Sequence, residues 1–149
     1  GSLTAVHYYH TANLLPDGRV LVAGGAAYST VCEVYDPASM TWTSTGSLAT
    51  GRHVHTGTLL ADGQVLVTGG LTTGDVRSNS CELYDPATGN WSVTDVLAQG
   101  RAWHQATLLN DGRVLVAGGF SSVDGFLATA ELYREGTAPA LPFNLLLLE

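Results

Sequence analysis

The stretch that decides the fold is Gly18-Arg19-Val20-Leu21-Val22-Ala23-Gly24-Gly25. It returns as Gly63-Gln64-Val65-Leu66-Val67-Thr68-Gly69-Gly70 and as Gly112-Arg113-Val114-Leu115-Val116-Ala117-Gly118-Gly119, so the copies start 45 and 49 residues apart. An Asp precedes each copy, and Asp-Gly is a strong signal for a tight turn between antiparallel strands. The continuous apolar centre is typical of a strand buried on both faces. The repeat therefore predicts an array of packed sheets.

Each copy resolves into the same four short strands, and no stretch has the period of a helix. Repeats of 20–50 residues indicate solenoids, propellers or arrays. The three repeats cover about residues 2–46, 47–95 and 96–149 of one segment, 1–149. The first strand is predicted at Thr11–Leu15, Thr56–Leu60 and Gln105–Leu109, the second in the quoted stretch, and the third at Cys32–Tyr35, Cys81–Tyr84 and Ala130–Tyr133. The fourth surrounds Trp42 and Trp91.

A Gly pair, then a Tyr, then a Trp seven residues later forms the most specific pattern in the chain. It reads Gly24-Gly25, Tyr35 and Trp42 in the first copy, and Gly69-Gly70, Tyr84 and Trp91 in the second. This pattern resembles the Kelch repeat, and the resemblance extends from about Leu3 to Tyr133. It implies an all-β fold in which each repeat is one four-stranded antiparallel blade of a β-propeller.

The third copy departs from this pattern. It keeps Gly118-Gly119 and Tyr133 but has no Asp-Pro turn and no Trp in the fourth strand. The tail 141–148 is expected either to replace that strand or to begin something else. Closed propellers have roughly 4–8 blades, so about three repeats form a partial, open propeller. The remaining blades of a longer chain, or a second copy of this one, are expected to complete the ring.

The composition excludes some classes of binding partner but does not indicate the cellular compartment. The net charge is −7, there is no Lys, and the six Arg are scattered singly. Nothing basic is concentrated enough to follow a phosphate backbone, so we expect no nucleic-acid partner. The apolar run Leu145–Leu148 is far too short for a membrane span, and we expect no membrane partner.

The two cysteines do not make a disulfide framework. Cys32 and Cys81 occupy the same position of the repeat, which Ala130 fills in the third copy. This series is typical of a small apolar core position. Equivalent positions on neighbouring blades should lie beyond the roughly 7 Å Cα–Cα limit of a disulfide, so two free thiols are expected.

The second-to-third-strand segments and the connections between blades share one rim, which is the predicted binding face. All the length difference between copies lies there, with six residues at 26–31 but ten at 71–80 and at 120–129. Loops on a rigid scaffold commonly carry function. The candidate binding residues in these segments are Tyr28, Leu71, Asp75, Arg77, Phe120, Asp124 and Phe126. In the blade connections, they are Tyr8 with His7 and Tyr9 nearby, His53 and Trp103.

Other residues recur at fixed positions and are predicted to belong to the framework. His10, His55 and His104 each stand at the entrance to a first strand. Neighbouring sheets pack about 10 Å apart, whereas zinc ligands lie about 2 Å from the metal. We therefore expect no metal there, but a hydrogen bond from one blade to the next. Burying a carboxylate without partners is costly, so Glu33, Glu82 and Glu131 should accept hydrogen bonds from backbone or from an Arg such as Arg52 or Arg101.

Three functions fit these patterns. The favoured interpretation is a non-catalytic scaffold that needs no cofactor and presents its loop-rich rim to a protein or glycan partner. Galactose-oxidase-type copper enzymes resemble Kelch proteins in their propeller, and in that family Tyr and His ligate copper and one Tyr is cross-linked to a Cys. No residue here matches those ligands, so the catalytic residues of such an enzyme would lie outside this chain. A structural assembly through the open blade faces is the third.

Overall fold

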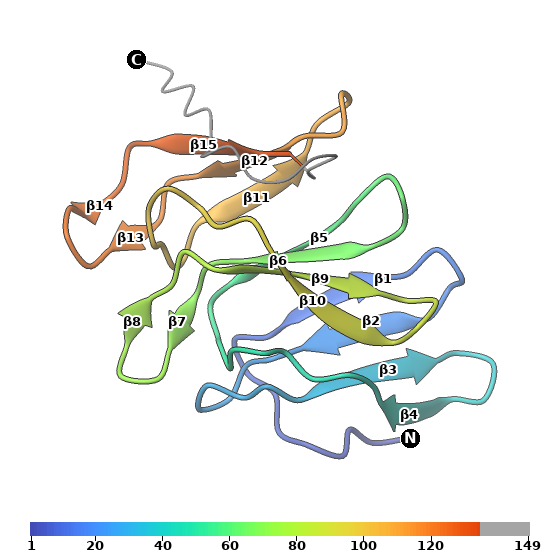
Figure 1. The fold of residues 1–149 in the computed structure, drawn as a ribbon. Helices are drawn as coiled ribbons and strands as arrows, with labels where there is room; N and C mark the ends of the chain where they lie inside the picture. The colour runs from blue at the N-terminus through green and yellow to red at the C-terminus, as the bar shows by residue number, and fades with distance from the viewer. Residues whose placement is uncertain (135–149) are drawn as a thin grey trace.

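The structure, a computed structural model, describes residues 1–134 and confirms the predicted all-β blades. The first sheet has the order β1 (Thr11–Leu14), β2 (Val20–Ala23), β3 (Cys32–Asp36) and β4 (Thr41–Ser44). The second has the order β5 (Thr56–Leu59), β6 (Val65–Thr68), β9 (Cys81–Asp85) and β10 (Asn90–Thr94). The third has β11 (Gln105–Leu108), β12 (Val114–Ala117) and β15 (Ala130–Tyr133). All pairings are antiparallel, and Figure 1 shows the three sheets stacked as successive blades.

The longer segments of the second and third blades were expected to be loops, and this expectation is wrong. Each contains a short two-stranded hairpin, β7 (Leu71–Thr72) with β8 (Val76–Arg77) and β13 (Phe120–Ser121) with β14 (Gly125–Phe126). Both hairpins project on the same side of the molecule in Figure 1. The four additional residues in each of these blades supply the chain for a hairpin, which the shorter segment 26–31 of the first blade lacks.

The predicted Asp-Gly turns are present, and the Tyr and Trp of the repeat form cross-strand pairs. At the Asp-Gly turns, Leu15 N–H donates to the Arg19 carbonyl at 2.8 Å, and Gly18 takes a φ of +87°, which favours glycine. The Tyr and Trp of the repeat face each other across strands three and four. The Tyr84 and Trp91 ring centroids are 5.1 Å apart, within the range of a favourable aromatic pair.

Apolar side chains between the blades form the core in two layers. In the first, Leu21 and Val34 of blade one pack with Val65, Val67 and Tyr84 of blade two. The second lies between blades two and three and contains Leu66, Leu83, Val114, Val116 and Tyr133. Leu66 is fully buried, and burial of such a side chain contributes roughly 1.5–3 kcal/mol. The central Val-Leu-Val run is apolar throughout because alternate residues face opposite neighbouring blades.

The second Gly of each pair lets the connection that leads into its own blade approach the sheet. Gly70 has a φ of +95°, and a Cβ added there would lie 2.7 Å from the His53 carbonyl oxygen. Any other residue would therefore clash with backbone as well as strain the conformation. The first strands β1, β5 and β11 lie side by side along the inner edge of the stacked blades. The suggested fourth strand of blade three, in the tail 141–148, falls outside the described residues.

Two rims follow from this topology. We call the loop rim the side formed by residues 24–31, 69–80 and 118–129 together with the segment 4–10 before β1 and the blade connections 45–55 and 95–104. Within residues 1–134, the opposite side carries short turns, including those at 36–40 and 85–89.

Candidate functional site

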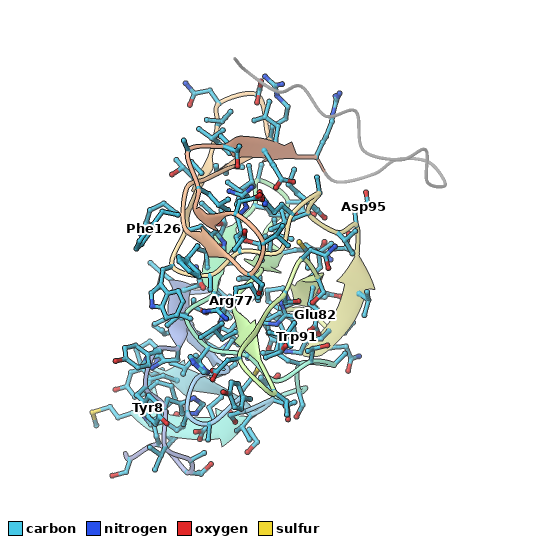
Figure 2. All side chains as sticks on the ribbon, turned by 90° about the vertical axis from the view of Figure 1, so that its left-hand side faces the viewer. Tyr8, Arg77, Glu82, Trp91, Asp95 and Phe126 are labelled. Carbon is cyan, nitrogen blue, oxygen red and sulfur yellow. The ribbon has the colours of Figure 1, made fainter. Side chains whose placement is uncertain are left out.

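The predicted binding residues lie along the loop rim, and Figure 2 looks onto it. Phe126, Arg77 and Tyr8 come from the third, second and first blades in turn. Beneath them lie the recurring polar residues, whose geometry determines how rigidly the rim is held.

Glu82 holds the connection between blades one and two through hydrogen bonds. It is buried, and it accepts hydrogen bonds from the Ala49 and Thr50 N–H groups at 2.6 and 3.1 Å. Arg52, fully buried, donates to it at 2.7 Å and also to the carbonyls of Gly69 and Ser80. One ion pair thus connects the blade connection, the Gly pair and the start of β9.

The third blade repeats this arrangement. Arg101 donates to Glu131 at 2.5 Å and to the Gly118 carbonyl at 2.9 Å, while Ala98 N–H donates to Glu131 at 2.6 Å. Both carboxylates therefore have the backbone and Arg partners that their recurrence suggested.

His7 takes the place of the arginine in the first blade. Its Nε2 lies 3.0 Å from Glu33 Oε2 and its Nδ1 lies 2.7 Å from the Gly24 carbonyl, with the side chain fully buried. The interpretation of His7 as a recognition residue is wrong, because its ring is enclosed by the framework. The 45 residues between His7 and Arg52 were the signal that this is one position of the repeat.

Glu33 also holds the N-terminal segment. Thr4 donates to it through both its N–H and its hydroxyl, and Ala5 donates through its N–H at 3.2 Å. Burial raises the pKa of Glu33, but the hydrogen bonds from Thr4, His7 and Ala5 together outweigh burial and lower it. The carboxylate is thus ionised at neutral pH.

Two of the three recurring histidines, His55 and His104, lie between blades. His55 Nε2 is 3.2 Å from Thr11 Oγ1 of blade one, and His104 Nε2 is 3.1 Å from Thr56 Oγ1 and 3.0 Å from Thr68 Oγ1 of blade two. Burial, followed by the charge of Arg52, lowers the pKa of His55 to about 3. Burial and Arg101 lower that of His104 to about 4, so both rings are neutral at pH 7. His10, on the outer face of blade one, is exposed.

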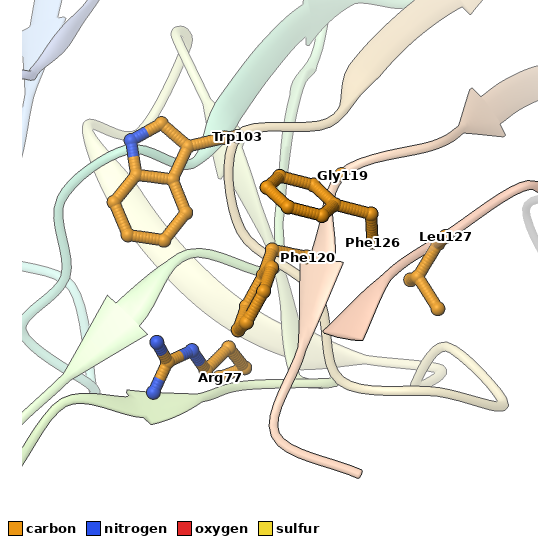
Figure 3. Close-up of a pocket in the computed structure, with 6 residues that line it drawn as sticks. All are labelled: Arg77, Trp103, Gly119, Phe120, Phe126 and Leu127. Atoms are coloured by element: carbon orange, nitrogen blue, oxygen red, sulfur yellow. The ribbon is translucent and has the colours of Figure 1, made fainter. Parts of the chain in front are cut away.

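A pocket of about 600 Å³ opens between the two hairpins of the loop rim. It is lined by Arg77 of β8, Trp103 of the blade connection, Phe120 and Phe126 of the β13–β14 hairpin, and neighbouring Gly119 and Leu127. Four of the ten predicted binding residues thus meet in one place, as Figure 3 shows. The sequence did not predict that Gly119 lines the pocket, because the recurrence of the Gly pair already indicated a structural role. It also did not predict Leu127.

Aromatic contacts order the walls of this pocket. The Phe120 and Phe126 ring centroids lie 5.1 Å apart in an edge-to-face arrangement, and Arg77 Cζ lies 5.1 Å from the Phe120 ring centroid. Phe120 lies between the other two side chains in Figure 3. Phe126 is 89% exposed and Trp103 54% exposed, so much of their surface is open to a ligand.

The other predicted binding residues divide into a second cluster and two exceptions. Tyr28 donates its hydroxyl to Asp75 Oδ1 at 2.7 Å, and its ring centroid is 4.9 Å from that of His53. Tyr8 lies beyond them on blade one, half exposed. Asp124 accepts a hydrogen bond from the side chain of Gln99.

The prediction that Leu71 contacts a partner is wrong. It is only 4% exposed, so its side chain is not available to a partner. Its backbone instead exchanges hydrogen bonds with His53, at 2.9 and 3.1 Å. The residue joins the β7–β8 hairpin to the blade connection.

Metal binding and membrane spanning each require a recognisable arrangement of residues. Residues 1–134 contain no group of three or more His, Cys, Asp or Glu side chains placed to hold a metal ion. The same part of the chain contains no helix that meets the length and hydropathy needed to span a membrane.

Three equivalent antiparallel sheets, stacked face to face with their first strands along one inner edge, define a segment of a β-propeller. Comparison with known families agrees with this class. The Kelch motif matches residues 52–94, which is the whole second blade, and a β-propeller domain of unknown function matches residues 109–130. The chain therefore contains a Kelch motif within a β-propeller segment, and Kelch motifs generally mediate protein interactions. A comparison with curated proteins gives no match.

Proposed function

We propose that this chain is a non-catalytic binding scaffold whose loop rim holds a partner protein in the pocket between the two hairpins. The pocket carries the proposal, because it gathers three aromatic side chains and one cation from segments 26 and 17 residues apart along the chain, at Arg77, Trp103 and Phe120. Aromatic residues and arginine dominate the energetics of protein interfaces. Their exposure here leaves that contact surface unused within the described residues.

The buried ion pairs beneath the loop rim support the same proposal, since a binding surface is most effective when its residues are already held in place before the partner binds. The buried pairs Arg52–Glu82 and Arg101–Glu131 fix the blade connections, and the second of these connections carries Trp103. A cavity of about 600 Å³ accommodates a few side chains of a partner, within the range typical of ligand sites. A glycan stacking on the same aromatic walls is the alternative partner.

The test is a double variant, Arg77→Ala with Phe126→Ala, against a matched single variant, Val123→Ala. Val123 is 88% exposed in the same hairpin but does not line the pocket. Selection from a random peptide library on the immobilised protein should enrich sequences that bind wild type and the Val123 variant, but not the double variant. All three proteins should melt at the same temperature. Peptides that bind all three equally would place the binding site elsewhere, and enrichment only from a glycan array would favour the glycan.

The non-catalytic part of the proposal has its own measurement. Under the competing function, a fragment of a galactose-oxidase-like copper oxidase, the catalytic residues lie outside this chain. We expect titration with Cu²⁺ to give no stoichiometric binding and no visible absorption band. A tightly bound copper with such a band would contradict the proposal and would show that copper ligands lie within this chain.

We also propose that further Kelch-type blades cover the two outer faces of the array, supplied by a longer chain or by a second copy. Leu66 and Leu83 of blade two are buried against blade three, whereas the equivalent Leu115 and Leu132 of blade three are only half buried. Apolar faces of this kind are normally covered. Light scattering distinguishes the sources, since twice the chain mass indicates a second copy. A soluble single chain that gains no stability when blades are added would contradict the proposal.

A further inference from the structure

Arg77 is the cation of the loop-rim pocket, and no carboxylate of residues 1–134 forms a salt bridge with it. Among residues 1–134, Arg19, Arg52, Arg101 and Arg113 each form a salt bridge with an Asp or Glu. Arg77 instead donates through Nη1 to the Asp75 backbone carbonyl at 2.8 Å, and its Nε is buried with no hydrogen-bond partner. In a chain with a net charge of −7, an arginine without an acidic partner is conspicuous.

The acidic side chains nearest in the hairpins are engaged elsewhere. Asp75, two residues before Arg77, accepts the hydroxyl of Tyr28 at 2.7 Å. Asp124, in the turn of the β13–β14 hairpin, accepts the side-chain amide of Gln99. Both carboxylates are thus held by donors other than Arg77. The positive charge of Arg77 therefore has no carboxylate partner among residues 1–134.

The rest of the pocket is apolar, and it fixes the guanidinium in place. Phe120 lies against the Arg77 guanidinium, with 5.1 Å from Cζ to the ring centroid, an arrangement that favours a cation over an aromatic face. Trp103, Phe126 and Leu127 supply the remaining walls, as Figure 3 shows. One face of the guanidinium is therefore covered by a ring, while an anion can approach its N–H edge.

We propose that this pocket binds a carboxylate that lies directly beside an apolar side chain, as presented by a peptide. The carboxylate pairs with Arg77, and the apolar side chain packs between Trp103 and Phe126. The proposal rests on the proposed function, since it specifies the partner segment that the loop rim would hold. One guanidinium matches one carboxylate in charge and in its bidentate geometry. A doubly charged phosphate would leave an uncompensated charge against apolar walls.

Two sources offer this chemistry, a free peptide C-terminus after an apolar residue and an internal Asp or Glu next to one. Four peptides distinguish them by calorimetric titration. Acetyl-Gly-Phe with a free carboxylate is compared with its amide, and acetyl-Phe-Asp-amide with acetyl-Phe-Asn-amide. We expect at least one acid to bind tenfold or more tightly than its neutral counterpart, because charge-assisted hydrogen bonds are about twice as strong as neutral ones. The pair that shows the larger ratio identifies the source.

Variants assign the preference to Arg77. Arg77→Met keeps an apolar stem and should bring acid and neutral peptide to within about twofold of each other. Phe126→Ala should weaken both peptides of a pair equally, and Val123→Ala should change neither. Arg77→Gln repeats the measurement if the Met variant melts at a lower temperature than wild type. Equal binding of acid and neutral peptides by wild type, or an acid preference that survives in both Arg77 variants, would overturn the inference.

Failure of this inference is separable from failure of the proposed function. If library-selected peptides depend on Phe126 but carry no acid–apolar pair, the loop rim is a binding site of a different specificity. If selected peptides bind the Arg77 and Phe126 double variant as well as wild type, both ideas fail together.

Discussion

Replacing Glu82 by Gln should destabilise the protein severely, and the structure gives the size of the effect. The Glu82 carboxylate accepts three hydrogen bonds, from Ala49 N–H to Oε2 and from Thr50 N–H and Arg52 Nη2 to Oε1. A glutamine retains one acceptor oxygen and places an NH₂ group against another donor. At least one hydrogen bond is lost, and the other two no longer receive a full negative charge.

The larger cost comes from Arg52, which stays charged and fully buried without its counter-ion. Breaking a buried ion pair on one side typically costs about 3–5 kcal/mol. That is a large fraction of the roughly 5–15 kcal/mol that stabilises an ordinary domain. At about 2–4 °C per kcal/mol for a chain of this size, we expect the melting temperature to fall by about 10 °C. Urea unfolding followed by tryptophan fluorescence, with thermal melts, measures both quantities.

The first blade provides a matched control. Glu33→Gln removes the equivalent carboxylate, but its partner His7 is an imidazole, which unlike a guanidinium does not have to carry a charge. At pH 8 the Glu33 variant should therefore be destabilised clearly less than the Glu82 variant. A Glu82→Gln protein that unfolds at the wild-type urea concentration, or two variants that lose equal stability, would refute the reasoning that an unbalanced buried charge dominates.

Two other measurements test the framework. Because burial lowers the pKa of His55 and His104 from 6.5 to about 3 and about 4, the unfolded chain binds more protons than the folded one below pH 6.5. Stability should thus decline as pH falls from about 6.5 towards 4, by about 2 kcal/mol per histidine between pH 6.5 and 5, and His104→Gln should remove about half of the decline in urea midpoints. Burial also raises the pKa of Cys32 to about 11 and of Cys81 to about 12, so a thiol reagent should leave the native protein unmodified and count two thiols in denaturant without reductant. A count below two would reveal a disulfide.

The repeat was sufficient to predict the blades because residues at equivalent positions have the same structural role in each copy. Asp-Gly turns, apolar centres and Gly pairs are each dictated by local geometry, and three copies of each removed the ambiguity of a single short strand. The Glu–Arg pairing was predictable for the same reason, since a buried carboxylate needs donors and Arg52 and Arg101 recur at one spacing. Chemistry that recurs at a fixed position can be interpreted without coordinates.

The pocket could be predicted only in part. Arg77, Trp103, Phe120 and Phe126 were each candidates because they stand on the rim where the copies differ. Their convergence depends on two hairpins that line one pocket. No residue pattern in 71–80 or 120–129 distinguished a hairpin from a loop before the structure placed β7, β8, β13 and β14. Leu71 was misjudged for the same reason, since it belongs to the hairpin base.

One position of the repeat contributes both to blade packing and to the candidate binding site. Tyr9, Val54 and Trp103 are equivalent, and all three have a φ between 49° and 56°, a conformation that is strained for such residues. A line of backbone hydrogen bonds maintains it, because Val54 N–H donates to the Tyr9 carbonyl at 2.9 Å and Trp103 N–H to the Val54 carbonyl at 3.2 Å. The conformation is therefore architectural, while the side chain it carries is free to differ from blade to blade. Trp103 lines the pocket from this position, so a strained backbone that serves blade packing also fixes an aromatic wall of the candidate site.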